Sequence, residues 1–266
     1  MLLDILIQTI WIVSVLAAPA DILKSNRSFA KRTSPEIADG FTTQHKTQIT
    51  DGFKDALRLA KTVQTAPDAT VDTILEKYFD SSDKETVMDL FKKITGSDDQ
   101  YAGNSILSQM NVVQDYADKK GKMGCYDPTI YAVTRRYTTS TPKMIICDSG
   151  FAFGGIDKSY TDVSAVTCST IGSIVSKKMD FLGATILHEY THWRSLVVPP
   201  LSEETDDLDG GYGPWEAQET VPKSEALKNA DNFTWFAIEL FWTVHCGREF
   251  AAPELDSDED CDSDDY

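Results

Sequence analysis

The chain has 266 residues, of which 41% are hydrophobic and 25% are charged, so it can bury one large core or two small ones. Its net charge of −17 argues against a nucleic-acid-binding protein, because nucleic acid attracts basic surfaces. The composition is that of a globular protein, and the residue patterns along the chain indicate which kind of globular protein it is.

The N-terminus has the pattern of a secretory signal peptide. Ile5 to Val15 are mostly apolar, and the small residues of Ala17–Ala20 suit cleavage, although no Lys or Arg precedes the apolar run. This run is shorter than the roughly 20 residues that a spanning helix needs. We therefore expect residues 1–20 to be removed from a secreted protein, which then has no membrane contact. Residues 21–40 read as a linker or short pro-segment, and the sequon at Asn26 is a candidate glycosylation site.

The next part of the chain has the apolar spacing of helices, with steps of three and four residues. The first expected helix starts near Thr43 and carries Ile49, Phe53, Leu57, Ala60 and Val63. A second covers Val71–Phe79, and a third follows a capping box at Ser82–Glu85 and ends at Gly96. We expect a fourth scaffold helix that carries Ile106, Met110, Val113 and Tyr116.

Residues 123–150 change character and favour strands. Two β-prone runs, Tyr131–Val133 and Met144–Ile146, are separated by Thr, Ser and Pro and predict a small antiparallel sheet. Cys125 and Cys147 bracket these runs, so a disulfide between them would pin the sheet in an oxidising compartment. The pairing of the other cysteines stays open, with the tail residue as the expected odd one: Cys168, Cys246 and Cys261.

The strongest chemical signal is the pentapeptide His188-Glu189-Tyr190-Thr191-His192, an H-E-x-x-H stretch. Apolar residues around it predict a helix from about residue 177 to residue 196. On that helix the two histidines share one face and can hold one zinc ion, with the glutamate close to a water on the metal. Histidine is scarce, with four in the chain, and two of the four lie in this motif.

The C-terminal part combines a loop, a buried helix and a tail. Ser202–Gly213 is polar and rich in glycine, whereas the expected helix Asp231–Val244 is apolar nearly all round and should be buried. The tail from Glu254 to Tyr266 holds eight acidic residues and no Lys or Arg, so we expect residues 251–266 to be disordered. No boundary interrupts residues 41–250, which we expect to form one domain.

The third zinc ligand is not given by the motif itself. A catalytic zinc ion usually takes three protein ligands, and the metzincin pattern is excluded because Ser195 and Val198 stand where it needs Gly and His. Glu216, His245 and Asp209 remain as candidates. Asp209 is favoured because the glycine pair after it lets the backbone fold tightly toward the motif helix.

Three segments together resemble the Asp-zincin family of secreted metalloendopeptidases, which includes deuterolysin-like and lysine-specific enzymes of fungi and some bacteria. These segments are Leu187–Trp193, Asp209–Gly213 and, before an aromatic helix, Asn229–Asp231. The family carries H-E-x-x-H followed by G-T-x-D-x-x-Y-G, whose Asp is the third ligand. The resemblance implies a mostly helical, zincin-like α+β domain with a small antiparallel sheet and an H-E-x-x-H active-site helix.

The resemblance also assigns roles to single residues. Matching on Tyr212-Gly213 places Asp209 at the ligand position, gives Tyr212 the oxyanion-stabilising role, and replaces the family Gly-Thr by Asp206-Asp207. Asp231 matches a substrate-binding residue of the lysine-specific branch, although Thr234 stands where that branch has a further acidic residue. The spacing of Cys125 and Cys147 likewise resembles a family disulfide.

Site chemistry and resemblance together imply a secreted zinc endopeptidase with one zinc ion per chain, held by His188, His192 and Asp209. Glu189 would take the proton of the attacking water and pass it to the leaving amine, while Tyr212 would donate a hydrogen bond to the oxyanion. We expect a monomer that acts on protein or peptide substrates, with no nucleic-acid partner. The alternative is a catalytically weak or inactive zinc-binding secreted protein that keeps the fold; the intact glutamate favours the enzyme.

Overall fold

The computed structural model describes residues 34–96, 102–114, 125, 129–135, 138–151 and 166–255, which all belong to one compact unit. The expected signal peptide, Asn26, Cys261 and most of the acidic tail lie outside the described residues. Within the part that is described, no helix is both long and apolar enough to cross a bilayer.

The first three predicted helices are confirmed. They are α1 (Thr43–Thr65), α2 (Asp68–Tyr78) and α3 (Lys84–Thr95). The capping box at Ser82 is not formed. Instead the Asp80 side chain accepts a hydrogen bond from the Ser82 N–H at 2.9 Å and starts the 3-10 turn η2 (Ser81–Asp83), which runs into α3.

The predicted fourth helix is wrong. The chain forms the short 3-10 turn η3 (Ser105–Gln109) and then the strand β2 (Asn111–Gln114). Met110 has extended backbone angles, and the β-branched pair Val112–Val113 lines up with Met144–Ile145 of a neighbouring strand. Pairing with that strand therefore outweighs the helical spacing, and Tyr116 lies outside the described residues.

The sheet has four short strands in the order β1-β2-β4-β3. Their bounds are β1 (Glu36–Ile37), β2 as above, β3 (Ala132–Arg135) and β4 (Lys143–Ile146). The predicted antiparallel pairing is correct for β3 and β4, but β2 runs parallel to both β1 and β4, so the sheet is mixed. The overall class is α+β, as expected.

Two disulfides cross-link the unit. The predicted Cys125–Cys147 bond is confirmed, and its second cysteine directly follows β4. A second bond, Cys168–Cys246, joins residues 78 positions apart and ties the end of the last helix to the segment before the motif helix.

The motif helix is shorter than predicted. The chain between residues 177 and 196 forms a 3-10 turn, η5 (Lys177–Met179), then α5 (Leu182–Thr191) and a single turn, α6 (Arg194–Val197). Phe181 and Trp193 have extended backbone angles and separate the three pieces. His192 follows the last α5 residue but keeps helical angles, so it still projects one turn after His188.

The last elements are mostly helical. A short helix α4 (Asp148–Phe151) follows β4, and the C-terminal part contains η6 (Glu216–Thr220), η7 (Lys223–Lys228) and α7 (Ala230–Cys246). The predicted aromatic helix is confirmed as α7, in which every residue from Ala230 to Thr243 is buried.

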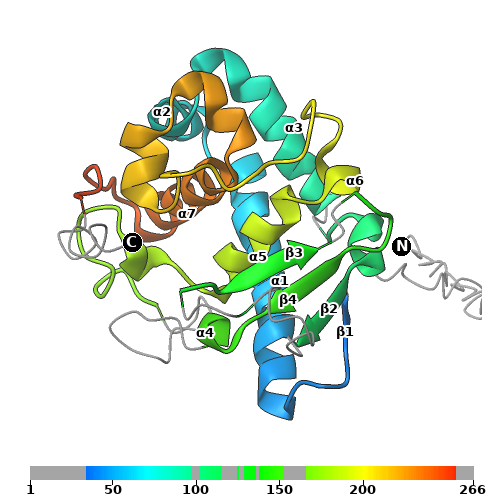
Figure 1. Cartoon of the computed structure of the whole chain (residues 1–266). Helices are drawn as coiled ribbons and strands as arrows, with labels where there is room; N and C mark the ends of the chain where they lie inside the picture. The colour runs from blue at the N-terminus through cyan, green and yellow to red at the C-terminus, as the bar shows by residue number, and fades with distance from the viewer. Residues whose placement is uncertain are drawn as a thin grey trace, which may run out of the picture. The chain divides into compact units, whose positions relative to one another are not determined.

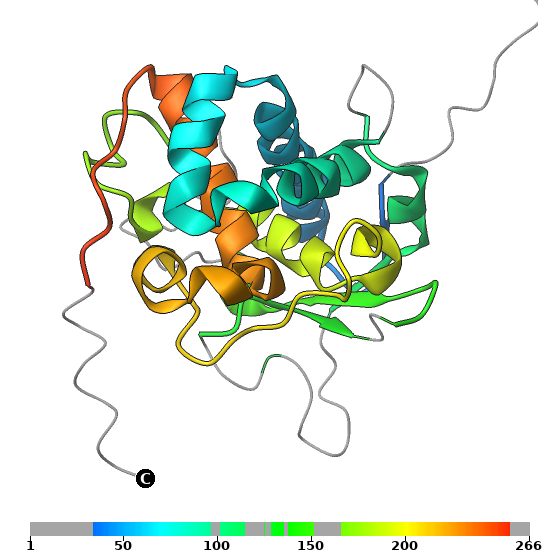
Figure 2. The same ribbon diagram turned by 90° about the horizontal axis from the view of Figure 1, so that it is seen from above.

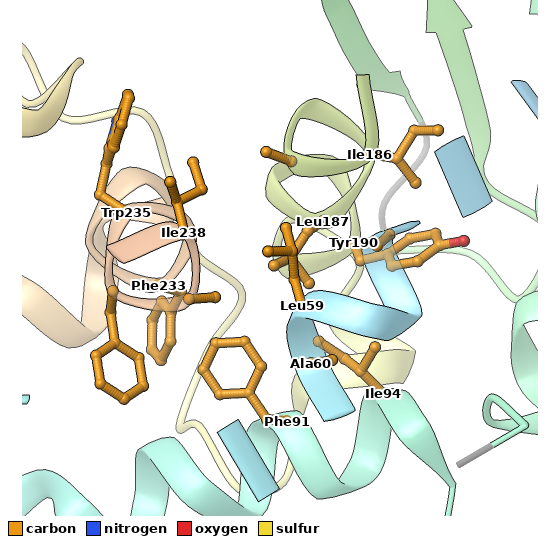
Figure 3. Packing of buried hydrophobic residues seen from close by; sticks show 14 of the residues in the cluster. Leu59, Ala60, Phe91, Ile94, Ile186, Leu187, Tyr190, Phe233, Trp235 and Ile238 are labelled. Carbon is orange, nitrogen blue, oxygen red and sulfur yellow. The ribbon is translucent and has the colours of Figure 1, made fainter. Parts of the chain in front are cut away.

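Helix α5 is held from three directions. It packs against α1, α7 and β3, and these helices lie on one side of the sheet (Figures 1 and 2). Figure 3 shows the core between them, with labelled side chains from four helices: Leu59 and Ala60, Phe91 and Ile94, Ile186, Leu187 and Tyr190, and Phe233, Trp235 and Ile238. The motif residues therefore project from a helix that is fixed by the main core.

Candidate metal centre

The two motif histidines and one loop carboxylate converge on a single point. Nε2 of His188 lies 3.2 Å from Nε2 of His192, and Oδ1 of Asp207 lies 3.0 Å and 3.3 Å from these two nitrogens. Of the residues that the structure describes, these three form the one group whose His, Cys, Asp or Glu ligand atoms lie close enough to share a metal ion, all within 4.8 Å.

Both imidazole rings are held through their Nδ1 atoms. The Nδ1 of His188 is 2.7 Å from a carboxylate oxygen of Asp231, and the Nδ1 of His192 is 2.9 Å from the backbone carbonyl of Thr205. A carbonyl oxygen can only accept, so the ring of His192 carries a proton on Nδ1, which leaves Nε2 as the nitrogen that could bind a metal ion. Such outer partners orient a ligand before the metal arrives.

The charges at this point are strongly coupled. Burial alone would lower the pKa of His188, but the hydrogen bonds that its ring donates to Asp207 and Asp231 raise it well above its ordinary value. The pKa of His192 is also raised, because its hydrogen bond with Asp207 outweighs burial. In turn the two rings hold the pKa of Asp207 well below its usual range against the opposing effect of burial. The carboxylate of Asp207 thus favours positive charge on the two rings that it contacts, as it would favour a cation between them.

Glu189 is buried beside the histidines with one oxygen unsatisfied. Its side chain is 3% exposed, and its Oε2 atom has no hydrogen-bond partner among the described residues. The Thr134 hydroxyl of β3 donates to the Glu189 backbone carbonyl at 3.2 Å and so ties this turn of α5 to the sheet. A buried carboxylate oxygen without a partner is costly, and such groups cluster at functional sites.

Asp231, expected in substrate binding, lies underneath the centre. It is 8% exposed, and its second carboxylate oxygen accepts a hydrogen bond from the Gly213 N–H at 2.6 Å. One carboxylate thus contacts both His188 and the backbone that follows Tyr212.

Tyr212 lies at the rim of the same centre. Its ring is 56% exposed and stacks over His188, with the ring centroids 6.3 Å apart and 18° between the planes. Partial burial, together with the charge and hydrogen bond of Asp207, raises the pKa of this phenol. The phenol therefore stays protonated and can donate a hydrogen bond.

Asp209, the expected third ligand, is not brought to the histidines. It is exposed in a tight turn, closed by the hydrogen bond from the Gly211 N–H to the Leu208 carbonyl at 2.8 Å, with Gly210 at a positive φ of 66°. The glycine pair makes this turn rather than swinging Asp209 inward. Asp207, two residues earlier, takes the place next to the histidines.

A signal for Asp207 was present in the sequence. Thr205-Asp206-Asp207 matches the T-x-D part of the family motif, with two extra residues before the Tyr-Gly pair. Matching from the tyrosine selects Asp209, two residues after the carboxylate that meets the histidines, and puts Asp206-Asp207 in the place of Gly-Thr. With Asp207 at the aspartate position of the motif, its threonine position is occupied by Thr205, which is buried.

The other candidates for the third ligand lie elsewhere. Glu216 is the first residue of η6 and does not belong to the group formed by His188, His192 and Asp207. His245 is near the end of α7, where its ring stacks on Phe241 with the centroids 5.5 Å apart.

The donor set fits zinc. Two imidazole nitrogens and one carboxylate oxygen are ligands that zinc accepts, and three protein ligands leave a position for water, as catalytic zinc sites do. The outer contacts of both rings and the unpaired Glu189 oxygen suit the same interpretation. Neither a protein-family model nor a curated protein matches the chain.

Proposed function

We propose that the protein is a secreted zinc-dependent endopeptidase that hydrolyses peptide bonds in proteins or peptides. The observation that carries the proposal is the convergence of His188, His192 and Asp207 beside the buried Glu189, whose Oε2 atom has no hydrogen-bond partner among the described residues. The resemblance to Asp-zincins supports the same class, with Asp207 rather than Asp209 in the ligand position.

The three convergent residues would hold one zinc ion. A bound zinc ion lowers the pKa of water and polarises a carbonyl group. The residues themselves supply the geometry: Asp231 and the Thr205 carbonyl fix the two rings, so that both Nε2 atoms face Asp207.

Glu189 is the proton carrier of the proposed reaction. Its position within the motif helix places it next to both histidines, and its free oxygen can accept a proton from the attacking water and donate it to the leaving amine. The hydrogen bond from Thr134 and the packing of α5 keep this carboxylate in place.

Tyr212 supplies the hydrogen bond to the substrate carbonyl oxygen as negative charge develops there. Its phenol is protonated and partly exposed, so it can approach a substrate that enters from solvent. The Gly213–Asp231 hydrogen bond fixes the backbone that carries this ring.

Secretion is part of the same proposal. Two disulfides suit an oxidising compartment, in agreement with the signal-like N-terminus. The compartment can be tested by expressing the full chain in a secreting host and determining the N-terminus of the protein in the medium.

The test of catalysis uses the secreted protein and casein. We expect digestion that stops with a chelator and returns with zinc. Glu189→Gln should bind zinc as the parent does but digest casein about 10²- to 10⁴-fold more slowly, because only the proton acceptor is removed. Zinc binding without digestion by the parent would instead support the non-catalytic alternative, and an active Glu189→Gln protein would exclude the mechanism.

A further inference from the structure

One buried threonine anchors the segment that carries Asp207. Between residues 202 and 210 every residue is exposed or half-buried except Thr205, which is 3% exposed. Its hydroxyl lies 2.7 Å from the hydroxyl of Thr191, the fully buried last residue of α5. This buried side chain thus joins the otherwise exposed loop to the motif helix two residues before the proposed ligand.

The direction of the hydrogen bonds can be assigned by counting protons. The Thr191 hydroxyl donates to the His188 carbonyl at 2.7 Å, and a hydroxyl has a single proton, so Thr191 must accept from Thr205. The Thr205 oxygen and carbonyl then face the His192 Nδ1–H at 3.3 Å and 2.9 Å. The chain of donors runs from His192 to Thr205, to Thr191 and to the His188 backbone.

Backbone contacts continue this connection to Asp207. The Thr205 N–H donates to the Thr191 carbonyl at 3.3 Å. The next residue, Asp206, donates its N–H to the Lys228 carbonyl and accepts from the N–H of Ala230, the first residue of α7. Asp207 follows directly, and its N–H is bound by the Asp206 side chain at 3.0 Å. The position of its carboxylate is therefore set by the two residues that precede it.

We propose that Thr191 and Thr205 form a hydroxyl latch that positions the carboxylate of Asp207 and the ring of His192 for zinc. Both threonines are positioning residues, since neither offers an atom to the metal group. The inference rests on the proposed zinc site, but not on proteolysis.

The test is zinc affinity, measured by competition with a chromophoric chelator on the full secreted chain. Thr205→Val keeps the shape but removes the hydroxyl, and we expect it to bind zinc about 10- to 100-fold more weakly, the usual effect of losing an outer-shell partner. Thr205→Ser keeps the hydroxyl and should bind zinc nearly as the parent does. Thr191→Val should weaken zinc binding similarly, and the double variant should add little to either single change.

Thr95→Val is the matched control. Thr95 is also fully buried at the end of a helix, and its hydroxyl donates to the carbonyl three residues before it at 3.1 Å, as that of Thr191 does. It should lower the thermal midpoint of the metal-free protein without changing zinc affinity. Parental zinc affinity in Thr205→Val, or a loss no greater than in Thr95→Val, would overturn the latch.

The outcomes also separate this inference from the proposed enzyme. A parent that binds zinc but digests no casein refutes the endopeptidase, while the affinity comparison still decides the latch. If Thr205→Val does not fold, Thr205→Ser and Thr205→Ala provide the same comparison. Equal affinity in these two variants would count against the latch.

Discussion

At the scale of single residues, the structure favours Asp207 over Asp209 as the third zinc ligand, and two substitutions can distinguish them. Asp207→Ala should reduce bound zinc severely, because one of three ligands is lost. Asp209→Ala should leave zinc binding unchanged, because that side chain is exposed in a turn. Bound zinc per chain after gel filtration measures both. The opposite order would restore Asp209 as the ligand.

Asp180, next to the start of α5, gives a prediction for pH. Burial raises the pKa of Asp180 to about 7, and the charge of Asp231 adds to this, although the hydrogen bond from the Phe181 N–H opposes it. The folded chain therefore binds this proton more tightly than the unfolded chain, whose aspartates titrate near 3.8. Hence the protonated Asp180 side chain adds to the free energy of unfolding at low pH, and this contribution is lost as pH rises from about 4 to about 7.

Asp180→Asn should remove the fall in stability that the ionisation of Asp180 causes. The amide oxygen can still accept from the Phe181 N–H, while the buried charge is absent. Urea unfolding of the metal-free proteins at about pH 5 and about pH 8 should show a stabilised variant mainly at the higher pH. Equal gains at both pH values would show that Asp180 is not the titrating group.

Single residues also show where the sequence is informative and where it is not. The approach of His188 to His192 could be predicted, because helical periodicity puts residues four positions apart on one face, with Glu189 between them in the sequence. The Thr205-x-Asp207 match favours Asp207 and the Tyr212-Gly213 match favours Asp209, and the choice between them depends on where a turn closes and on Thr205 reaching Thr191. Asp231 matched a family position, but its contacts with His188 and Gly213 required the tertiary structure.

At the scale of elements, α1 and α5 cross closely at two glycines. A Cβ atom on Gly183 of α5 would lie 2.5 Å from the Cβ of Asp55, which is fixed to the α1 backbone. A Cβ on Gly52 of α1 would instead meet the flexible end of Ile186 at 2.7 Å. The two sites therefore offer a matched comparison within one contact.

Gly183→Ala should destabilise the protein by about 1–3 kcal/mol, the usual cost of overpacking, whereas Gly52→Ala should cost less because Ile186 can turn away. Thermal unfolding measured by circular dichroism compares the two variants. A larger loss in Gly52→Ala would show that Ile186 of α5 cannot turn away and that the α1 side of the contact yields more easily.

Element boundaries were predictable where local signals act alone. Helices α1, α2, α3 and α7 follow from their apolar spacing, and β3–β4 from two β-prone runs. The break at Trp193 and the conversion of residues 111–114 into a strand were not predictable from spacing. Both depend on partners distant in sequence: the Trp193 indole donates to the Thr139 carbonyl, and β2 pairs with β4.

At the scale of the whole molecule, the two disulfides close loops of very different length. Chain-entropy estimates give about 3.4 kcal/mol for the 22-residue separation of Cys125 and Cys147, and about 4.5 kcal/mol for the 78-residue separation of Cys168 and Cys246. Replacing the second pair by serine should therefore lower the thermal midpoint more than replacing the first. A larger effect of the Cys125–Cys147 pair would mean that local strain or residual structure outweighs loop length.

The centre joins three distant parts of the chain, namely α5, the loop around Asp207 and, through Asp231, the start of α7. A zinc ion bound there would act as a reversible cross-link that mass action controls. The folded protein would gain about 2.7 kcal/mol when free zinc is a hundred times its dissociation constant. Heat resistance would then follow the zinc concentration of the surroundings, so that the same protein is robust in a zinc-rich medium and easily unfolded where zinc is scarce.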